Sequence, residues 1–245
     1  MSDIRLNSSK LGTQEYWNTF YEREIGNFEH NEDDTGECWF DDSDAESKMI
    51  EFLIQKINDG ELPRHYDTLN IIDLGTGNGH LLFQMYDDFE QELDVQVDYN
   101  FKGIDYSAES VDFSNKIKSK KYEDQRFEFE QVDLLKKQSD FLDANREKYD
   151  ILLDKGTLDA IALNQEPVED LDGKIGMDVY GSQVEKLMHR DSILLITSCN
   201  FTEEELVKII TKETELKVWD KITYPVFEFG GVKGSTICSI AFIKE

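Results

Sequence analysis

The chain has 245 residues, with 26 Lys and Arg against 53 Asp and Glu, so its formal net charge is −27. That length suits one domain with an extension, and that charge disfavours nucleic acid and anionic membranes while favouring a basic protein partner. Hydrophobic residues make up 39% of the chain and aromatic residues 11%, which indicates a packed domain rather than a disordered chain.

Metal sites, disulfides and membrane segments are not expected either. The cysteines Cys38, Cys199 and Cys238 lie far apart without a CxxC pair, and the few histidines are scattered. The N-terminal residues lack the apolar core of a signal peptide, and no apolar run approaches the ~20 residues that span a bilayer. We therefore expect a soluble, intracellular protein.

Residues 1–60 are predicted to form an N-terminal extension that is helical and rich in aromatic side chains. A helix over Thr13–Ile25 would bring four aromatic residues onto one face, namely Tyr16, Trp17, Phe20 and Tyr21. Something must cover such a face, because aromatic side chains gain free energy when they leave water. The extension is thus expected to pack against the rest of the protein.

An acidic segment, residues 27–47, follows this helix and is predicted to be a loop that carries Trp39 and Phe40. A second helix should come next, with apolar residues at helical spacing from Met49 onwards. Ser43 and Glu46 have the spacing of a capping box, in which each side chain bonds the backbone of the other residue. We expect this box to start the second helix.

Residues 61–245 are predicted to form the main domain, because short apolar runs alternate there with helical patterns, as in βα units around a mainly parallel sheet. Strands are expected at Leu69–Leu74, Asn100–Asp105, Phe127–Gln131, Tyr149–Asp154 and Ser192–Ser198, and helices at Gly79–Phe89, Ala108–Lys118, Val179–Met188 and Glu203–Thr211. Two last strands, Leu216–Thr223 and Ser235–Ile243, should form an antiparallel hairpin at the end of the sheet. Asp87–Asp98 and Asn164–Gly176 are predicted to be polar insertions in loops.

The stretch IIDLGTGNG, Ile71–Gly79, places three glycines directly after the first predicted strand. Such a turn lets a ligand approach the backbone where open α/β sheets bind ligands. His80 stands where a dinucleotide site requires its third glycine, and the Gly-Lys-Ser/Thr of a Walker loop is missing. An acid followed by alternate glycines suits a ligand with a cationic amino-acid end, such as S-adenosylmethionine.

Acidic residues also end the next two predicted strands, since Asp105 follows KGI and Asp133 follows QV. Asp105 can accept both ribose hydroxyls of a nucleoside, and Asp133 can accept the adenine amino group. Each feature alone has a plain structural reading as a turn or a helix cap, but the three acids in register favour cofactor binding. The predicted cofactor-binding residues are Trp17, Asp73, Leu74, Gly75, Thr76, Gly77, Asn78, Gly79, Asp105, Tyr106, Ser107, Asp133, Leu134 and Asp154.

The blocks DKGTLDA at Asp154–Ala160 and TSCNFT at Thr197–Thr202 lie on the two loops expected beside the methyl group. Together with LGTQEYWNTFYERE, DTGECWF and PVFEFGGVKGSTICSIAF, they closely resemble the lysine methyltransferases of translation elongation factor 1-alpha, from about Leu11 to the C-terminus. This resemblance implies a Rossmann-like class I methyltransferase fold with seven strands, the last antiparallel, and S-adenosylmethionine as donor. It also implies elongation factor 1-alpha as partner, a cytoplasmic location and, in fungal relatives, a link to intracellular transport. A monomer is expected.

Methyl transfer from a sulfonium requires alignment of nitrogen, carbon and sulfur more than acid–base machinery. The lysine must still arrive neutral, so an aromatic pocket and a nearby carboxylate should help. Tyr16, Trp17, Trp39 and Phe201 are candidates for the aromatic wall, and the predicted catalytic residues are Asp154, Lys155, Asn200 and Phe201. Two other hypotheses stay open, a methyltransferase with another acceptor and a non-catalytic binding module. Thr202 and Glu205 are predicted to cap a helix.

Overall fold

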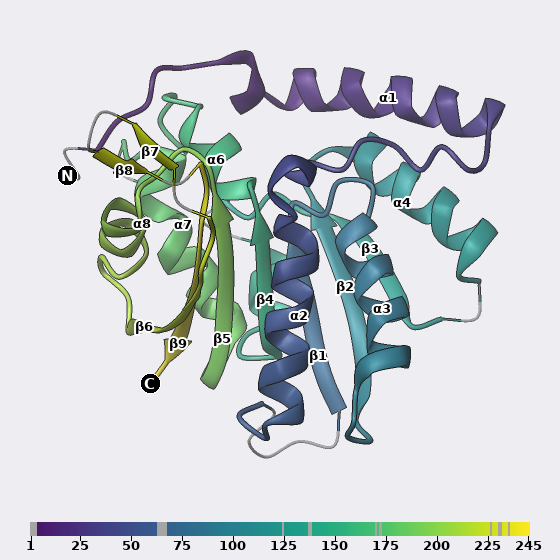
Figure 1. Cartoon of the computed structure of the whole chain (residues 1–245). Helices are drawn as coiled ribbons and strands as arrows, with labels where there is room; N and C mark the ends of the chain where they lie inside the picture. The colour runs from purple at the N-terminus through teal and green to yellow at the C-terminus, as the bar shows by residue number, and fades with distance from the viewer. Residues whose placement is uncertain are drawn as a thin grey trace.

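The computed structural model describes residues 4–62, 68–123, 125–136, 139–169, 171, 173–225, 227–229, 232–234 and 236–245. A seven-stranded sheet lies between two layers of helices, and helix α1 crosses the top of the sheet in the view of Figure 1. Within the described residues, no helix is both long enough and apolar enough to cross a membrane.

The strands of the large sheet are β1 Thr68–Leu74, β2 Asp98–Asp105, β3 Phe127–Gln131, β4 Tyr149–Lys155, β5 Met188–Ser198, β6 Leu216–Ile222 and β9 Cys238–Lys244. Their order in space is β3-β2-β1-β4-β5-β9-β6. Strands β1 to β5 pair in parallel, and β9 is antiparallel to both of its neighbours, β5 and β6. The predicted sheet, including its antiparallel last strand and the terminal hairpin, is confirmed.

The segment between β6 and β9 contains two short strands, β7 Phe227–Phe229 and β8 Val232–Gly234, which form a separate antiparallel pair (Figure 1). The sequence analysis did not anticipate this pair. Ser235, the first residue of the expected last strand, lies outside the described residues. The strand itself begins at Cys238.

The helices are α1 Gln14–His30, α2 Ala45–Asn58, α3 His80–Glu92, α4 Ala108–Lys121, α5 Asp140–Ala144, α6 Thr157–Ala162, α7 Gly176–Val184 and α8 Glu203–Ile210. Short 3-10 turns occur at Lys10–Gly12, Asp41–Ser43 and Glu185–Leu187. The βα alternation read from the sequence therefore holds for the main domain. The predicted capping box of Thr202 and Glu205 is also present at the start of α8.

Successive residues of the central strands supply the two cores, because side chains of a strand point to opposite faces. On β4, Leu152 packs in the cluster that contains α5, α6, α7 and α8. Its neighbours Ile151 and Leu153 pack in the other cluster, which contains α1, α2, α3 and α4. Both faces of a parallel sheet must be covered, which explains why its strands read as nearly continuous apolar runs.

Helix α1 lies over the end of the sheet where the parallel strands terminate (Figure 1). Phe20, Tyr21 and Phe28 are buried in the same cluster as α2, α3 and α4, and the rings of Phe28 and Phe113 have centroids 5.8 Å apart. The aromatic face of this helix is thus covered, as predicted. The position of α1 brings aromatic side chains to the strand ends where the glycine turn lies.

Besides the end of the first helix, which was expected at Ile25 and lies at His30, three predictions of local structure are wrong. The helix expected to end at Met188 ends at Val184, and Met188 begins β5 instead. The insertion expected from Asp87 is helical up to Glu92, since Phe89 continues the buried side of α3 and contacts β2. The insertion at 164–176 is mostly loop, as predicted, and its residues 170 and 172 lie outside the described ones.

The third error concerns the start of α2. Its N-cap residue is Asp44, which has a left-handed backbone with φ 50° and makes no side-chain cap hydrogen bond. A capping box requires an extended N-cap residue, so Ser43 and Glu46 cannot form one here. The Glu46 side chain instead contacts His80, Cys38 and Lys155, which lie far away in the sequence.

Candidate active site

A cavity of about 250 Å³ opens where β1, β2, β3 and β4 end. The turn before α1, the α1 helix and the segment that follows it contribute Gly12, Trp17, Tyr21, Glu37, Trp39 and Phe40. The strand ends and their loops contribute Asp73, Gly75, Thr76, Gly77, Asn78, Asp105, Tyr106, Val132, Asp133, Leu134, Leu135, Lys155, Gly156 and Thr157. The loop after β4 and the helices α6 and α7 complete the lining with Asp159, Ala160, Ile161 and others.

The glycine turn permits close contacts that a side chain would prevent. Gly77 has φ 59°, and a Cβ atom there would lie 2.5 Å from the Tyr21 hydroxyl oxygen. Gly75 has φ 71°, and a Cβ atom there would lie 2.2 Å from Oγ1 of Thr157. Glycine is therefore required at both positions for backbone conformation and for space, since α1 and α6 both approach the turn.

Asp105 holds this turn in place. Its Oδ2 accepts a hydrogen bond from the Gly77 N–H at 3.0 Å, and its Oδ1 accepts one from the Ser107 N–H at 2.9 Å. Burial raises the pKa of Asp105 above its usual value, while these hydrogen bonds act in the opposite direction. A carboxylate has about four acceptor positions, so Asp105 keeps acceptor capacity for a ligand in the cavity.

Asp73 and Asp133 also line the cavity, in different surroundings. Asp73 is only 3% exposed, and burial raises its pKa to about 7. Asp133 is exposed, and its Oδ1 accepts a hydrogen bond from the Leu135 N–H at 3.0 Å. The three acidic strand ends predicted from the sequence therefore meet at one cavity, with Asp73 deepest in the protein.

Aromatic side chains from α1 and the segment after it form a wall of the cavity. The rings of Trp17 and Trp39 have centroids 5.4 Å apart, and the Trp17 indole donates a hydrogen bond to the Leu11 carbonyl at 2.8 Å. The Trp39 indole nitrogen is buried without a hydrogen-bond partner among the described residues. Burying a hydrogen-bond donor without an acceptor costs free energy. The wall is therefore suited to a ligand that supplies a hydrogen-bond acceptor.

Asp154, predicted to bind cofactor and to serve in catalysis, is fully buried and is not among the residues that line the cavity. Its Oδ1 accepts from the Thr157 N–H at 2.7 Å, and its Oδ2 accepts from the Leu158 N–H at 3.0 Å and from the Tyr180 hydroxyl. Burial raises the pKa of Asp154 to about 7. Asp154 thus holds the first turn of α6 in place.

Asp159 is the carboxylate that α6, the helix after β4, presents to the cavity. It is 5% exposed, and it accepts hydrogen bonds from the Ser198 hydroxyl at 2.5 Å and the Cys199 N–H at 2.8 Å. Burial raises the pKa of Asp159. No role was predicted for Asp159 from the block DKGTLDA, because only the turn of α6 shows which of its two acids faces the cavity.

Other predicted site residues lie away from the lining. Leu74 is part of the hydrophobic core, and Gly79 and Ser107 are the N-cap residues of α3 and α4. Phe201 is 5% exposed within the core, so it is not part of the aromatic wall. Asn200 bonds the Asp159 carbonyl at 3.5 Å and also lies outside the lining. Tyr21 and Phe40, which had no predicted site role, do line the cavity.

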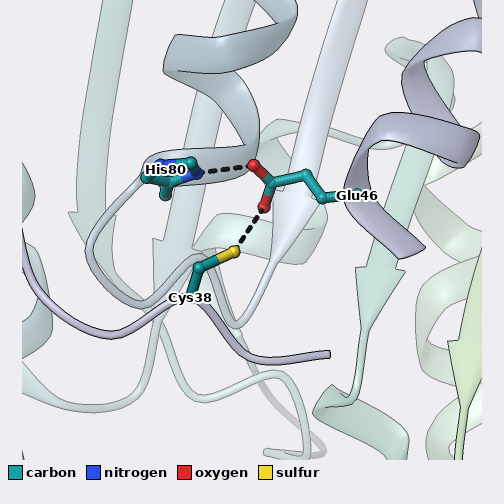
Figure 2. A group of neighbouring side chains, drawn as sticks. All are labelled: Cys38, Glu46 and His80. Atoms are coloured by element: carbon teal, nitrogen blue, oxygen red, sulfur yellow. Dashed lines mark hydrogen bonds and ion pairs between the residues drawn. The ribbon is translucent and has the colours of Figure 1, made fainter. Parts of the chain in front are cut away.

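The structure also gathers Cys38, Glu46 and His80, whose potential ligand atoms all lie within 4.8 Å of one another (Figure 2). Figure 2 shows the Glu46 carboxylate between the other two side chains, with His80 Nδ1 2.5 Å from Oε1 and Cys38 Sγ 3.5 Å from Oε2. The sequence analysis expected no metal site, because these residues are far apart in the chain. Their meeting depends on how α2 and α3 pack.

This sheet order, with a ligand cavity over a glycine turn after β1, defines a class I methyltransferase. A family model described as a methyltransferase domain matches residues 65–231. The crystal structure of magnesium protoporphyrin IX methyltransferase (ChlM) from Synechocystis PCC 6803 with bound SAM superposes with a TM-score of 0.57. It is 15% identical and the match covers 97% of this chain and 99% of that one, so it supports the fold.

Two curated relatives identify the family more closely. Protein-lysine N-methyltransferase EFM4 of Saccharomyces cerevisiae is 47% identical over 242 residues, 98% of this chain and 97% of that protein. EEF1A lysine methyltransferase 2 of Homo sapiens is 31% identical over 239 residues, 96% of this chain and 87% of that protein. The chain belongs to this family of protein-lysine N-methyltransferases, as the resemblance of its motifs predicted.

Proposed function

We propose that this protein transfers methyl groups from S-adenosylmethionine to a lysine of translation elongation factor 1-alpha. The observation that carries the proposal is the cavity at the strand ends, which is lined by Asp73, the glycine turn, Asp105 and an aromatic wall. The family supports the acceptor, since its members include EEF1A lysine methyltransferase 2. We further propose that the protein acts as a monomer in the cytoplasm without binding nucleic acid or membranes.

The lining residues fit the parts of the donor. The buried carboxylate of Asp73 suits its cationic amino group, and Asp105 has acceptor capacity for the ribose hydroxyls. Asp133, at the end of β3, suits the adenine amino group. The Trp39 indole N–H needs an acceptor, and a nucleoside with an amino-acid end offers several. When bound, the donor would supply an electrophilic methyl group: a neutral amine attacks the methyl carbon in line, and the thioether sulfur leaves with the electron pair of the broken C–S bond.

Asp159 takes the role that the sequence analysis gave to Asp154. An incoming lysine ammonium has an ordinary pKa of about 10.4 and must lose a proton before it can attack. Asp159 lines the cavity, so its carboxylate can accept a hydrogen bond from that ammonium, orient the nitrogen and take up the departing proton. The faces of Trp17 and Trp39 can hold the methylated cation by cation–π attraction, while Asp154 supports the helix that carries Asp159.

The test is mass spectrometry of unmethylated elongation factor 1-alpha after incubation with this protein and S-adenosylmethionine. We expect a mass gain of one or more methyl groups on a single lysine. Asp105→Ala should abolish the gain, because it removes the acceptor that also holds Gly77. Asp143→Ala is a matched control, since Asp143 pairs with Arg146 on the surface and does not line the cavity.

Calorimetry with the donor separates the remaining hypotheses. Donor binding without methylation of the factor would point to another protein or a small molecule as acceptor. If the donor does not bind at all, the chain would be a non-catalytic module, such as a binding partner in intracellular transport. Methylation of the factor by the Asp105→Ala variant at the normal rate would contradict the proposed donor site.

A further inference from the structure

Lys155, at the end of β4, has its ammonium surrounded by acceptors. Its Nζ lies 3.1 Å from Oε2 of Glu46, 3.0 Å from the Trp39 carbonyl oxygen and 3.7 Å from Sγ of Cys38. A lysine ammonium has three donors and no acceptor. All three donors therefore have partners, and the side chain is 12% exposed. In this arrangement Lys155 has no lone pair with which to take a proton from a substrate.

Glu46 connects this ammonium to a second cation, His80 (Figure 2). Burial opposes the charge of Glu46, but the hydrogen bond to His80 and the charge of Lys155 prevail and lower its pKa to about 2. Hydrogen bonds with Cys38 and Glu46 raise the pKa of His80 to about 10. A buried carboxylate between two cations is stable only while both remain, so the group acts as a unit.

This unit ties together four segments around the cavity. Cys38 and Trp39 belong to the segment after α1, Glu46 to the first turn of α2, His80 to the first residue of α3, and Lys155 to the end of β4. Phe40, which follows Trp39 in the chain, has φ 67°. Its ring lies 2.7 Å from the position that a Cβ atom on Gly156 would occupy. Trp39 and Phe40 both line the cavity, so the unit fixes part of its wall.

We propose that Lys155 is a positioning residue: Glu46, itself held by His80, holds the Lys155 ammonium, and the ammonium holds Trp39 and Phe40 in place as a wall of the donor cavity. The sequence analysis predicted a catalytic role for Lys155 instead. The inference rests on the proposed function, because the cavity is taken to bind the donor. A Cys–Glu–His set is also a ligand set for divalent metals, but here the Lys155 ammonium already supplies a cation beside the Glu46 carboxylate.

The test uses Glu46→Gln and Lys155→Met, both in a Trp219→Phe background so that the indole emission comes from Trp17 and Trp39. The first change removes a charge and keeps the shape, and the second removes the ammonium. We expect both variants to shift the indole emission without donor present, because Trp39 loses its anchor. We expect the dissociation constant of S-adenosylmethionine to rise about tenfold, the effect of losing one hydrogen bond to a charged group.

The turnover number at saturating donor should fall by less than about threefold in both variants, a change worth under 1 kcal/mol in the barrier. Lys155→Arg should restore the emission and most of the affinity, because a guanidinium keeps the charge and the donors. Lys48→Met is the matched control. Lys48, on α2, is likewise a lysine with an acidic partner, Asp44, but it does not line the cavity, so emission and affinity should not change.

Three outcomes would overturn the inference. A collapse of the turnover number with unchanged donor affinity would make Lys155 a catalytic residue. Weaker donor binding without a change in emission would mean that Lys155 acts on the donor directly. Binding of Zn²⁺ to the wild type that disappears in Cys38→Ser would make the cluster a metal site. Absence of donor binding in the wild type would instead defeat the proposed function, and the emission shift of the variants would still test the anchor.

Discussion

At Asp73, burial favours the neutral carboxyl group, whereas the cationic amino group of the donor favours the charged carboxylate. Burial raises the pKa of this carboxyl to about 7, so in the free protein it is mostly protonated below that pH and charged above it. The cationic amino group of the donor requires the charged form. We predict that the dissociation constant of S-adenosylmethionine falls up to roughly tenfold per pH unit from about pH 5.5 to 7 and then levels off. Calorimetry across that range measures this.

Asp73→Asn is the control for this titration, since it keeps the shape and removes the charge. The variant should bind the donor weakly at every pH, and a wild-type profile as flat as that of the variant would contradict the role of Asp73. Without donor, the folded protein binds the Asp73 proton more tightly than the unfolded chain does. The contribution of Asp73 to the free energy of unfolding must therefore fall as pH rises from about 4 to 7.

Among single residues, the motif acids were predictable because they follow apolar runs directly in the chain. Asp73, Asp105 and Asp133 all line the cavity as expected. Asp154 and Asp159 could not be told apart in the same way. They are five residues apart, at the end of β4 and on α6, and only the turn of α6 buries Asp154 behind Thr157 while leaving Asp159 in the lining.

At the scale of elements, the stabilisation of α6 by its hydrogen-bonded connection to α7 can be measured. The Tyr180 hydroxyl, on α7, donates to the buried carboxylate of Asp154, which in turn holds the first turn of α6. Tyr180→Phe leaves that carboxylate short of one partner. We predict that the free energy of unfolding falls by about 1–3 kcal/mol, measured by urea denaturation, and that the turnover number falls as well because α6 carries Asp159.

Tyr122→Phe is a matched control for this change. Its hydroxyl donates to Asp87 at 2.8 Å, but that bond is only partly buried and lies away from the cavity. The loss of stability should be below about 1 kcal/mol there, since water can replace the lost hydroxyl. Equal losses of unfolding free energy in the two variants would mean that the burial of Asp154 adds nothing to its stabilisation of α6.

Element boundaries were predictable where a local pattern decides them and unpredictable where a distant contact does. The capping box of Thr202 and Glu205 involves only neighbours in the chain, and it forms. Ser43 and Glu46 have the same spacing, but Glu46 bonds His80 and Lys155 instead. A buried ion pair with two cations outweighs one cap, which is worth about 1 kcal/mol.

For the whole molecule, the net charge of −27 should govern encounter with a basic protein substrate. We predict that KM for elongation factor 1-alpha rises as ionic strength increases from about 0.05 to 0.3 M, because salt screens long-range attraction, while kcat changes little. Steady-state kinetics over that range tests this. The affinity for S-adenosylmethionine, measured by calorimetry in the same buffers, should depend on salt much less.

A KM that does not change with salt would contradict electrostatic steering and would shift attention to short-range contacts at the cavity rim. A kcat that falls with salt while KM stays constant would point instead to a step after binding. Either result would leave the donor site untouched, because the donor cavity is defined by buried groups that salt screens only weakly.

The sequence by itself determined the seven strands of the large sheet and six of the helices, the sheet class, the glycine turn and the three acidic strand ends, but not α5, α6, β7 or β8. Each of these depends on residues that are close in the chain, so spacing and local chemistry suffice to read them. The resemblance of long motif blocks determined the family in the same way. Composition and charge determined the kind of partner to consider.

Tertiary structure decided which side chains meet at the cavity. Trp17, Tyr21 and Trp39 reach the strand ends only because α1 and the following segment cross over the sheet. Cys38, Glu46, His80 and Lys155 come from four segments and meet only when α2 and α3 pack beside β4. Such contacts depend on long-range packing, which spacing along a single chain does not encode.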